Sequence, residues 1–158
     1  ADDGEQLINR PKEVFDNAMP SGNSVAAYVL KRLASLTAEE KWRRLLEQQL
    51  CFLTSQAKIY PTGFSFTMIA IMRELYPQEN LICVTAESDI QEKIIDYLVK
   101  KNKTDLDVML ITPENKQELA KIAPFTEAYT LPEQGTVYYV CHHGACKSSV
   151  DELDKVFQ

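Results

Sequence analysis

The chain has 158 residues, of which 45% are hydrophobic and 25% are charged, and its formal net charge is −6. This composition is typical of a globular protein with one domain or two small ones, and the acidic balance argues against a surface for nucleic acid or anionic membranes. No apolar run approaches the roughly 18 residues that a membrane-spanning helix needs. The acidic start, Ala1–Glu5, does not predict a signal peptide.

Two helices are predicted first, joined as a hairpin. Ser21 is a good N-cap for a helix that runs to about Leu36. Thr37 and Glu40 have the spacing of a capping box, which predicts the start of a second helix. Because the turn between the two helices is minimal, we expect them to pack antiparallel.

A third helix is predicted to begin at Thr62 as its N-cap and to end at Tyr76-Pro77. Apolar residues cover nearly its whole circumference, which is typical of a buried helix. The hairpin alone cannot cover all of this surface, so further helices are expected around it. Residues 1–78 are therefore predicted to be a helical segment.

Residues 79–158 have a different pattern of hydrophobicity. Short unbroken apolar runs, typical of strands covered on both faces, lie at Leu81–Val84, Val108–Ile111 and Val137–Val140. Helical patterns are predicted after the capping box Ser88–Gln91, over about Lys116–Ile122 and after the capping box Ser149–Glu152. The alternation predicts a small β-α-β-α-β-α segment with three parallel strands and right-handed crossovers, and the fold class is mixed α/β.

A short turn motif occurs twice in the helical segment. The sequence Pro-Ser-Gly-Asn-Ser at 20–24 returns as Pro-Thr-Gly-Phe-Ser at 61–65, 41 residues later, and each copy precedes a helix. In a ring of helical hairpins, alternate helices run parallel, so the two helix starts would emerge on one rim. Hydroxyls, an amide and an aromatic ring suit a sugar or polyol, and the candidate ligand-binding residues are Ser21, Asn23, Ser24, Tyr60, Thr62 and Ser65. The alternative is that Ser21 and Thr62 only cap their helices.

Asp16 lies four residues before the first of these turns. It is the candidate catalytic residue, as a general acid or base, and the alternative is a cap of a local turn. A glycosidase needs a second carboxylate at a suitable separation, and the sequence does not identify that partner.

The chain has four cysteines, too few for a disulfide scaffold, and a reducing, cytoplasmic environment is expected. Cys51 and Cys83 lie in apolar patterns and are expected to be buried. Cys141 and Cys146 flank His142-His143-Gly144-Ala145 after the third strand, and they could form a disulfide loop, a redox pair, two ligands of a metal ion or an inert pair. No second cysteine pair completes a zinc site and no nucleotide-binding fingerprint is present, so neither a metal nor a cofactor is expected.

The segment Arg10-Pro11-Lys12-Glu13, then Asp16, then Pro20–Ala27, resembles the C-terminal region of the YyaL-like proteins. These are thioredoxin-domain-containing proteins related to the spermatogenesis-associated protein homologues. Tyr60–Gly63 and the Tyr139-Val140-Cys141-x4-Cys146 segment resemble later motifs of the same family. Two departures lie near Asp16: Asn17 stands where the family pattern has glycine, and Met19 precedes Pro20.

The resemblance implies a longer protein in which a thioredoxin-like domain precedes an (α/α)6 toroid. That toroid resembles those of N-acylglucosamine 2-epimerases and six-hairpin glycosidases. Residues 1–78 would be its last helices, and the remainder of the same chain would be the partner that covers the third helix. The chain would then contribute part of a sugar-type or polyol-type pocket and would be inactive alone. The alternatives are a thiol-redox or protein-interaction module that uses Cys141 and Cys146, and an interaction fragment that forms homo-oligomers through the third helix.

Overall fold

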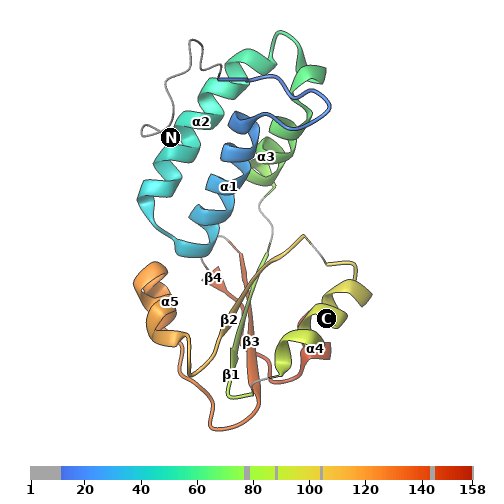
Figure 1. The fold of residues 1–158 in the computed structure, drawn as a ribbon. Coiled ribbons are helices and arrows are strands. Elements are labelled where there is room, and N and C mark those ends of the chain that lie inside the picture. The colour runs from blue at the N-terminus through green and yellow to red at the C-terminus, as the bar shows by residue number, and fades with distance from the viewer. Residues whose placement is uncertain (1–11, 77–78, 88, 104, 143–144, 158) are drawn as a thin grey trace, which may run out of the picture.

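The computed structural model describes residues 12–76, 79–87, 89–103, 105–142 and 145–157. Three helices form one group, and a small sheet with helices on both faces lies beside it (Figure 1). The chain is thus mixed α/β, with its helical part first. None of the helices in the described ranges is long and apolar enough to cross a membrane.

The helical group contains the predicted hairpin. Its elements are α1 (Gly22–Thr37), α2 (Glu40–Ala57), the 3-10 turn η1 (Pro61–Phe64) and α3 (Ser65–Leu75). The buried side chains between them include Leu53, Phe64 and Ala70. The Ser21 cap is observed, since its side chain accepts a hydrogen bond from the Ser24 N–H.

Two predicted caps are wrong. Thr37 is the last residue of α1 rather than the start of a capping box, and its hydroxyl donates to the Leu33 carbonyl (2.8 Å), one helical turn back. Thr62 lies inside η1, and Phe64 stands at the N-cap position of α3. The proline of the repeated turn begins a 3-10 turn here, so the N-cap of α3 lies at Phe64 instead of at Thr62.

The predicted burial of α3 holds on one side only. Thr67 and Ala70 are fully buried, whereas Ile69 and Met72 are 46% and 53% exposed. Two neighbouring helices cover only part of a helix circumference, so the rest of this apolar surface is left uncovered by the described residues.

The sheet has four strands in the order β2-β1-β3-β4. They are β1 (Asn80–Thr85), β2 (Asp107–Ile111), β3 (Thr136–His142) and β4 (Ala145–Cys146). β1 and β2 are parallel and α4 (Ile90–Lys100) connects them, but β3 is antiparallel to β1, with Val84 opposite Val137. The prediction of three parallel strands is therefore wrong, because an unbroken apolar run reports that both faces are covered and not which way the strand runs.

Each face of the sheet has its own core. On one face, Leu81 and Cys83 contact α4 through Ile94 and Leu98. On the other, Ile82, Val84 and Ile111 contact α5 (Lys116–Ile122) and the 3-10 turn η2 (Pro124–Ala128). Figure 1 shows α4 and α5 on opposite sides of the strands, as expected for three layers.

The predicted last helix is absent from the described C-terminal residues. Val150 instead pairs with Tyr138 in an isolated antiparallel bridge, and only a 3-10 turn, η3 (Leu153–Lys155), follows. Ser149 and Glu152 therefore form no capping box, because backbone pairing with β3 holds this segment extended. Ser88, Pro77, His143 and Gly144, which entered the predictions, lie outside the described residues.

Polar contacts join the helical group to the sheet. Arg32 of α1 forms an ion pair with the buried Asp107 at the start of β2 (Nε to Oδ1, 2.7 Å). The Asn80 amide donates to the Ser35 hydroxyl (2.9 Å). These contacts place the C-terminal half of α1 against the N-terminal ends of β1 and β2.

Candidate functional site

The two repeated turns meet at one carboxylate. Oδ1 of Asp16 accepts hydrogen bonds from the Ser21 N–H (2.8 Å) and the Ser24 hydroxyl (2.5 Å). Oδ2 accepts from the N–H groups of Phe66 (2.9 Å) and Thr67 (3.1 Å). The starts of α1 and α3 therefore lie at the same end of the helical group, with Asp16 between them.

The environment of Asp16 favours its ionised form. Burial raises the pKa of this carboxyl, but the hydrogen bonds from Ser24, Ser21, Thr67 and Phe66 outweigh it and hold the pKa below its ordinary value. The positive ends of two helix dipoles act in the same direction. An ionised carboxylate with four donors is suited to joining helices and poorly suited to donating a proton as a general acid.

The other residues of the repeated turns are largely used within the protein. Ser21 and Ser24 are buried, and Asn23 donates to the Glu13 carbonyl (2.6 Å) and accepts from Gln49 (3.0 Å). Tyr60, Thr62 and Ser65 are exposed, and the Ser65 hydroxyl donates to the Thr62 carbonyl (3.2 Å).

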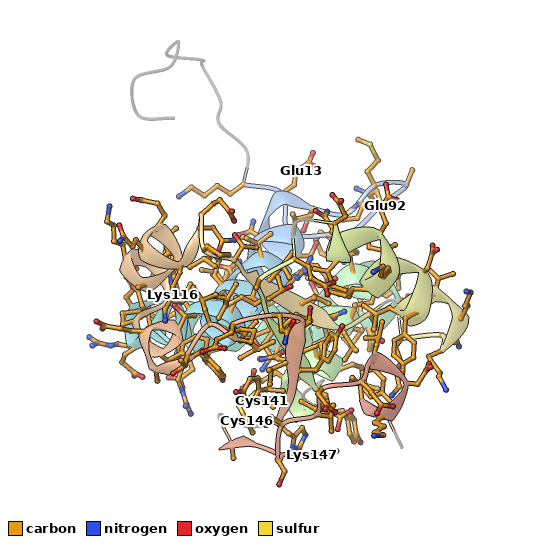
Figure 2. The ribbon with its side chains drawn as sticks, turned by 90° about the horizontal axis from the view of Figure 1, so that it is seen from below. Glu13, Glu92, Lys116, Cys141, Cys146 and Lys147 are labelled. Atoms are coloured by element: carbon orange, nitrogen blue, oxygen red, sulfur yellow. A yellow bond between two sulfur atoms is a disulfide. The ribbon has the colours of Figure 1, made fainter. Side chains whose placement is uncertain are left out.

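Cys141 and Cys146 form a disulfide between β3 and β4. The disulfide loop that their spacing allowed is therefore present. The yellow bond in Figure 2 marks the pair, at the edge of the molecule beside Lys147. Cys141 is buried and Cys146 is exposed, so a molecule approaching from solvent meets Cys146 first.

Tyr129, which follows η2, completes the site. Its hydroxyl lies 3.4 Å from the sulfur of Cys146 and 3.9 Å from that of Cys141. Disulfide sulfurs carry no proton, so the tyrosine hydroxyl is the donor in both contacts. Burial, with a smaller effect of Tyr139, raises the pKa of Tyr129 above its ordinary value of 10.0, so the hydroxyl, protonated at neutral pH in any case, stays a donor in more alkaline solution.

The position of Tyr129 is set by packing. Its ring lies edge-on to the ring of Tyr139 on β3, with 4.9 Å between the ring centres. The Lys116 ammonium of α5 donates to the Tyr129 carbonyl. Nothing in the sequence spacing pointed to this residue, since Tyr129 is brought to the cysteines only by the chain reversal between α5 and β3.

A cavity of about 870 Å³ opens beside the disulfide. It lies between the α1–α2 hairpin and the face of the sheet that carries Cys141. Its lining includes Leu46, Leu50, Ile82, Phe125, Tyr129 and Cys146. Charged side chains of the helical group, such as Glu39, Arg43 and Glu47, also line the cavity, so it combines apolar and charged surface next to the disulfide.

The remaining candidate ligands are dispersed. Cys83 is buried as predicted, and burial raises its pKa to about 12, so it is an unreactive thiol at neutral pH. Cys51 is exposed on α2, so its predicted burial is wrong, because its position faces outward on a hairpin that buries only one side. Among the residues that the structure describes, no three His, Cys, Asp or Glu side chains are grouped to hold a metal ion.

Comparison with protein-family models, with curated proteins and with solved structures finds no match to this chain.

Proposed function

We propose that Cys141 and Cys146 form a thiol–disulfide exchange site. The observation that carries this proposal is the asymmetry of the pair: Cys146 is exposed, Cys141 is buried, and the Tyr129 hydroxyl lies within 3.9 Å of both sulfurs. Exchange sites need one accessible sulfur, one departing sulfur and a group that stabilises the thiolate that departs.

The reaction begins when a partner thiolate attacks the sulfur of Cys146. The Cys141–Cys146 bond breaks, a mixed disulfide forms between the partner and Cys146, and Cys141 departs as a thiolate. The Tyr129 hydroxyl turns its hydrogen bond toward this thiolate, which stabilises the charge. A second thiolate of the partner then attacks the partner's first sulfur, which is bonded to Cys146 in the mixed disulfide. The partner thereby forms its own disulfide, and Cys146 is released as a thiolate. The partner dithiol loses two electrons and two protons, and the cysteine pair gains them.

The experiment follows the mixed disulfide. In a Cys51→Ser background, which removes the other exposed thiol, Cys141→Ser leaves Cys146 as a single accessible thiol. A chromogenic disulfide should label this variant rapidly, and the adduct should persist because no second thiol resolves it. Cys146→Ser is the matched control, and its buried Cys141 should react much more slowly.

The proposal also requires exchange in the native pair. The Cys51→Ser protein should be reduced by dithiothreitol while it remains folded, and the reduction potential should be measurable against glutathione buffers. A pair that is reduced only after the protein unfolds would contradict an exchange function.

A second candidate function, part of a sugar-type or polyol-type pocket, follows from the resemblance to YyaL-like proteins. The uncovered apolar residues of α1 and α3 support it, since additional toroid helices would cover them: Val25, Val29, Ile69 and Met72. In that arrangement the exposed Tyr60, Thr62 and Ser65 face a sugar or polyol, and Asp16 holds the two helix starts that shape the rim. Calorimetric titration of sugars into the full-length protein tests this candidate, and Thr62→Ala with Ser65→Ala should abolish the binding if the rim is the site.

A further inference from the structure

The backbone beside Cys146 points to a particular kind of partner. In the pairing of β3 with β4, Cys141 lies opposite Cys146. The Lys147 N–H donates to the Val140 carbonyl (2.9 Å), so this neighbouring pair is hydrogen-bonded. Hydrogen-bonded and non-bonded pairs alternate in an antiparallel ladder. The N–H and C=O of Cys146 therefore point away from β3, toward the outer side of β4.

That outer side is a sheet edge. β4 ends the strand order, and within the described ranges no further strand lies beyond it. The edge is also short. After Lys147, the chain next pairs with β3 through Val150, opposite Tyr138. Two residues, Ser148 and Ser149, thus face the single residue Tyr139, which is a β-bulge that bends the strand and interrupts a longer edge.

We propose that the partner of the exchange site is an extended cysteine-containing polypeptide that pairs with β4 at Cys146. This inference rests on the proposed exchange function and names the class of its substrate. A residue that exchanges both backbone hydrogen bonds with Cys146 lies about 5.5 Å from it between Cα atoms. Disulfide-bonded residues have Cα separations of about 4.4–6.8 Å, so the same placement suits a mixed disulfide.

The placement also directs the attack. Directly opposed residues on neighbouring strands carry their side chains on the same face of a sheet. A partner cysteine opposite Cys146 would put its sulfur on the face that carries the disulfide, with Cys146 between it and Cys141. Displacement at sulfur requires the attacking and departing sulfurs to lie roughly in line with the sulfur between them. The partner strand, β4 and β3 would place the sulfurs of the partner cysteine, Cys146 and Cys141 in that order. The partner residues two positions before and after its cysteine carry their side chains on this same face, which is the face of the cavity that Tyr129 and Phe125 line.

The test compares two peptides with the same sequence, in which valines flank a single cysteine. In one of the two peptides, the backbone nitrogen of the cysteine is methylated. Methylation removes the N–H that would donate to the Cys146 carbonyl and leaves the thiol in place. Second-order rate constants for mixed-disulfide formation are measured with the oxidised Cys51→Ser protein, after correction for the pKa of each thiol. The unmethylated peptide should react about tenfold faster or more, as expected for one backbone hydrogen bond and the steric effect of the methyl group.

A neutral small thiol, 2-mercaptoethanol, separates this inference from the exchange function. Equal rates for both peptides, with 2-mercaptoethanol also reacting, would overturn strand pairing and leave the exchange site standing. Failure of all three thiols to react with the folded protein would overturn both proposals.

Discussion

The carboxylate of Asp16 accepts a hydrogen bond from the backbone N–H of Thr67 at 3.1 Å, across 51 residues of sequence. The same carboxylate accepts from Ser21 at the start of α1. One side chain therefore satisfies free N–H groups at the starts of two helices, which explains why both copies of the repeated turn lie at one end of the helical group.

Asp16→Asn should destabilise the protein. The amide has one acceptor oxygen, and its NH2 group would face helix N–H donors, so the expected loss is about 1–3 kcal/mol in the free energy of unfolding. Urea unfolding followed by circular dichroism measures it. Asp89→Asn is the control, because Asp89 is exposed and its side chain makes no cap bond to α4. Equal stabilities for the two variants would show that the junction contributes little.

The contribution of Asp16 should depend on pH with a definite sign. The pKa of its carboxyl is lowered in the folded protein from the ordinary value of 3.8. Its stabilising effect is therefore complete above that ordinary value and is lost as the pH falls through the lower folded value. The stability difference between the native chain and Asp16→Asn should be constant from pH 7 to about 5 and should narrow below about pH 4. A difference that widens in acid would contradict the lowered pKa.

The glycines of the two repeated turns should respond differently to alanine. At Gly63 an added Cβ would lie 2.7 Å from a ring carbon of Tyr60 and 3.2 Å from one of Phe15, whereas at Gly22 it meets no atom within 4 Å. Gly63→Ala should cost about 1–2 kcal/mol because the rings must shift. Gly22→Ala, in the first turn of α1, should be neutral or stabilising by up to about 1 kcal/mol. Thermal unfolding of the two variants compares them, and equal melting temperatures would disprove the difference.

Tyr129→Phe should slow disulfide exchange without unfolding the protein. The variant keeps the ring and loses only the hydroxyl that lies near both sulfurs. Loss of a hydrogen bond to a departing thiolate should lower the rate of reduction by dithiothreitol about tenfold or more. Tyr139→Phe is the control, because it preserves the edge-on ring contact with Tyr129 and changes no contact to sulfur. An unchanged rate in Tyr129→Phe would remove the tyrosine from the mechanism.

Much of the local structure could be predicted because its causes lie within a few residues. The Ser21 cap and the apolar stripes of the hairpin follow from helical spacing. The three short apolar runs form β1, β2 and β3, because a strand covered on both faces needs an unbroken apolar sequence. The caps at Thr37 and Thr62 failed because a side-chain pattern permits a cap, while the path of the neighbouring backbone determines whether it forms.

The site could be predicted only in part. The short spacing of Cys141 and Cys146 allowed a disulfide among several alternatives, and the β3–β4 pairing makes it the observed one. Tyr129 could not be predicted, since its approach to the sulfurs depends on how α5 and η2 pack against the sheet. Asp16 was identified as a candidate catalytic residue, but its partners come from two helices that are distant in sequence.

The sequence by itself determined the approximate positions of the three-helix group and of β1, β2 and β3, because helix hydrogen bonds and apolar periodicities are local. It also determined that two similar turns precede two helices. Only the tertiary structure decided that β3 runs antiparallel to β1, since burial on both faces is compatible with either direction. Only the tertiary structure joined Asp16 to both helix starts and Tyr129 to the disulfide, because a contact between distant segments forms when packing brings donor and acceptor within about 3–4 Å.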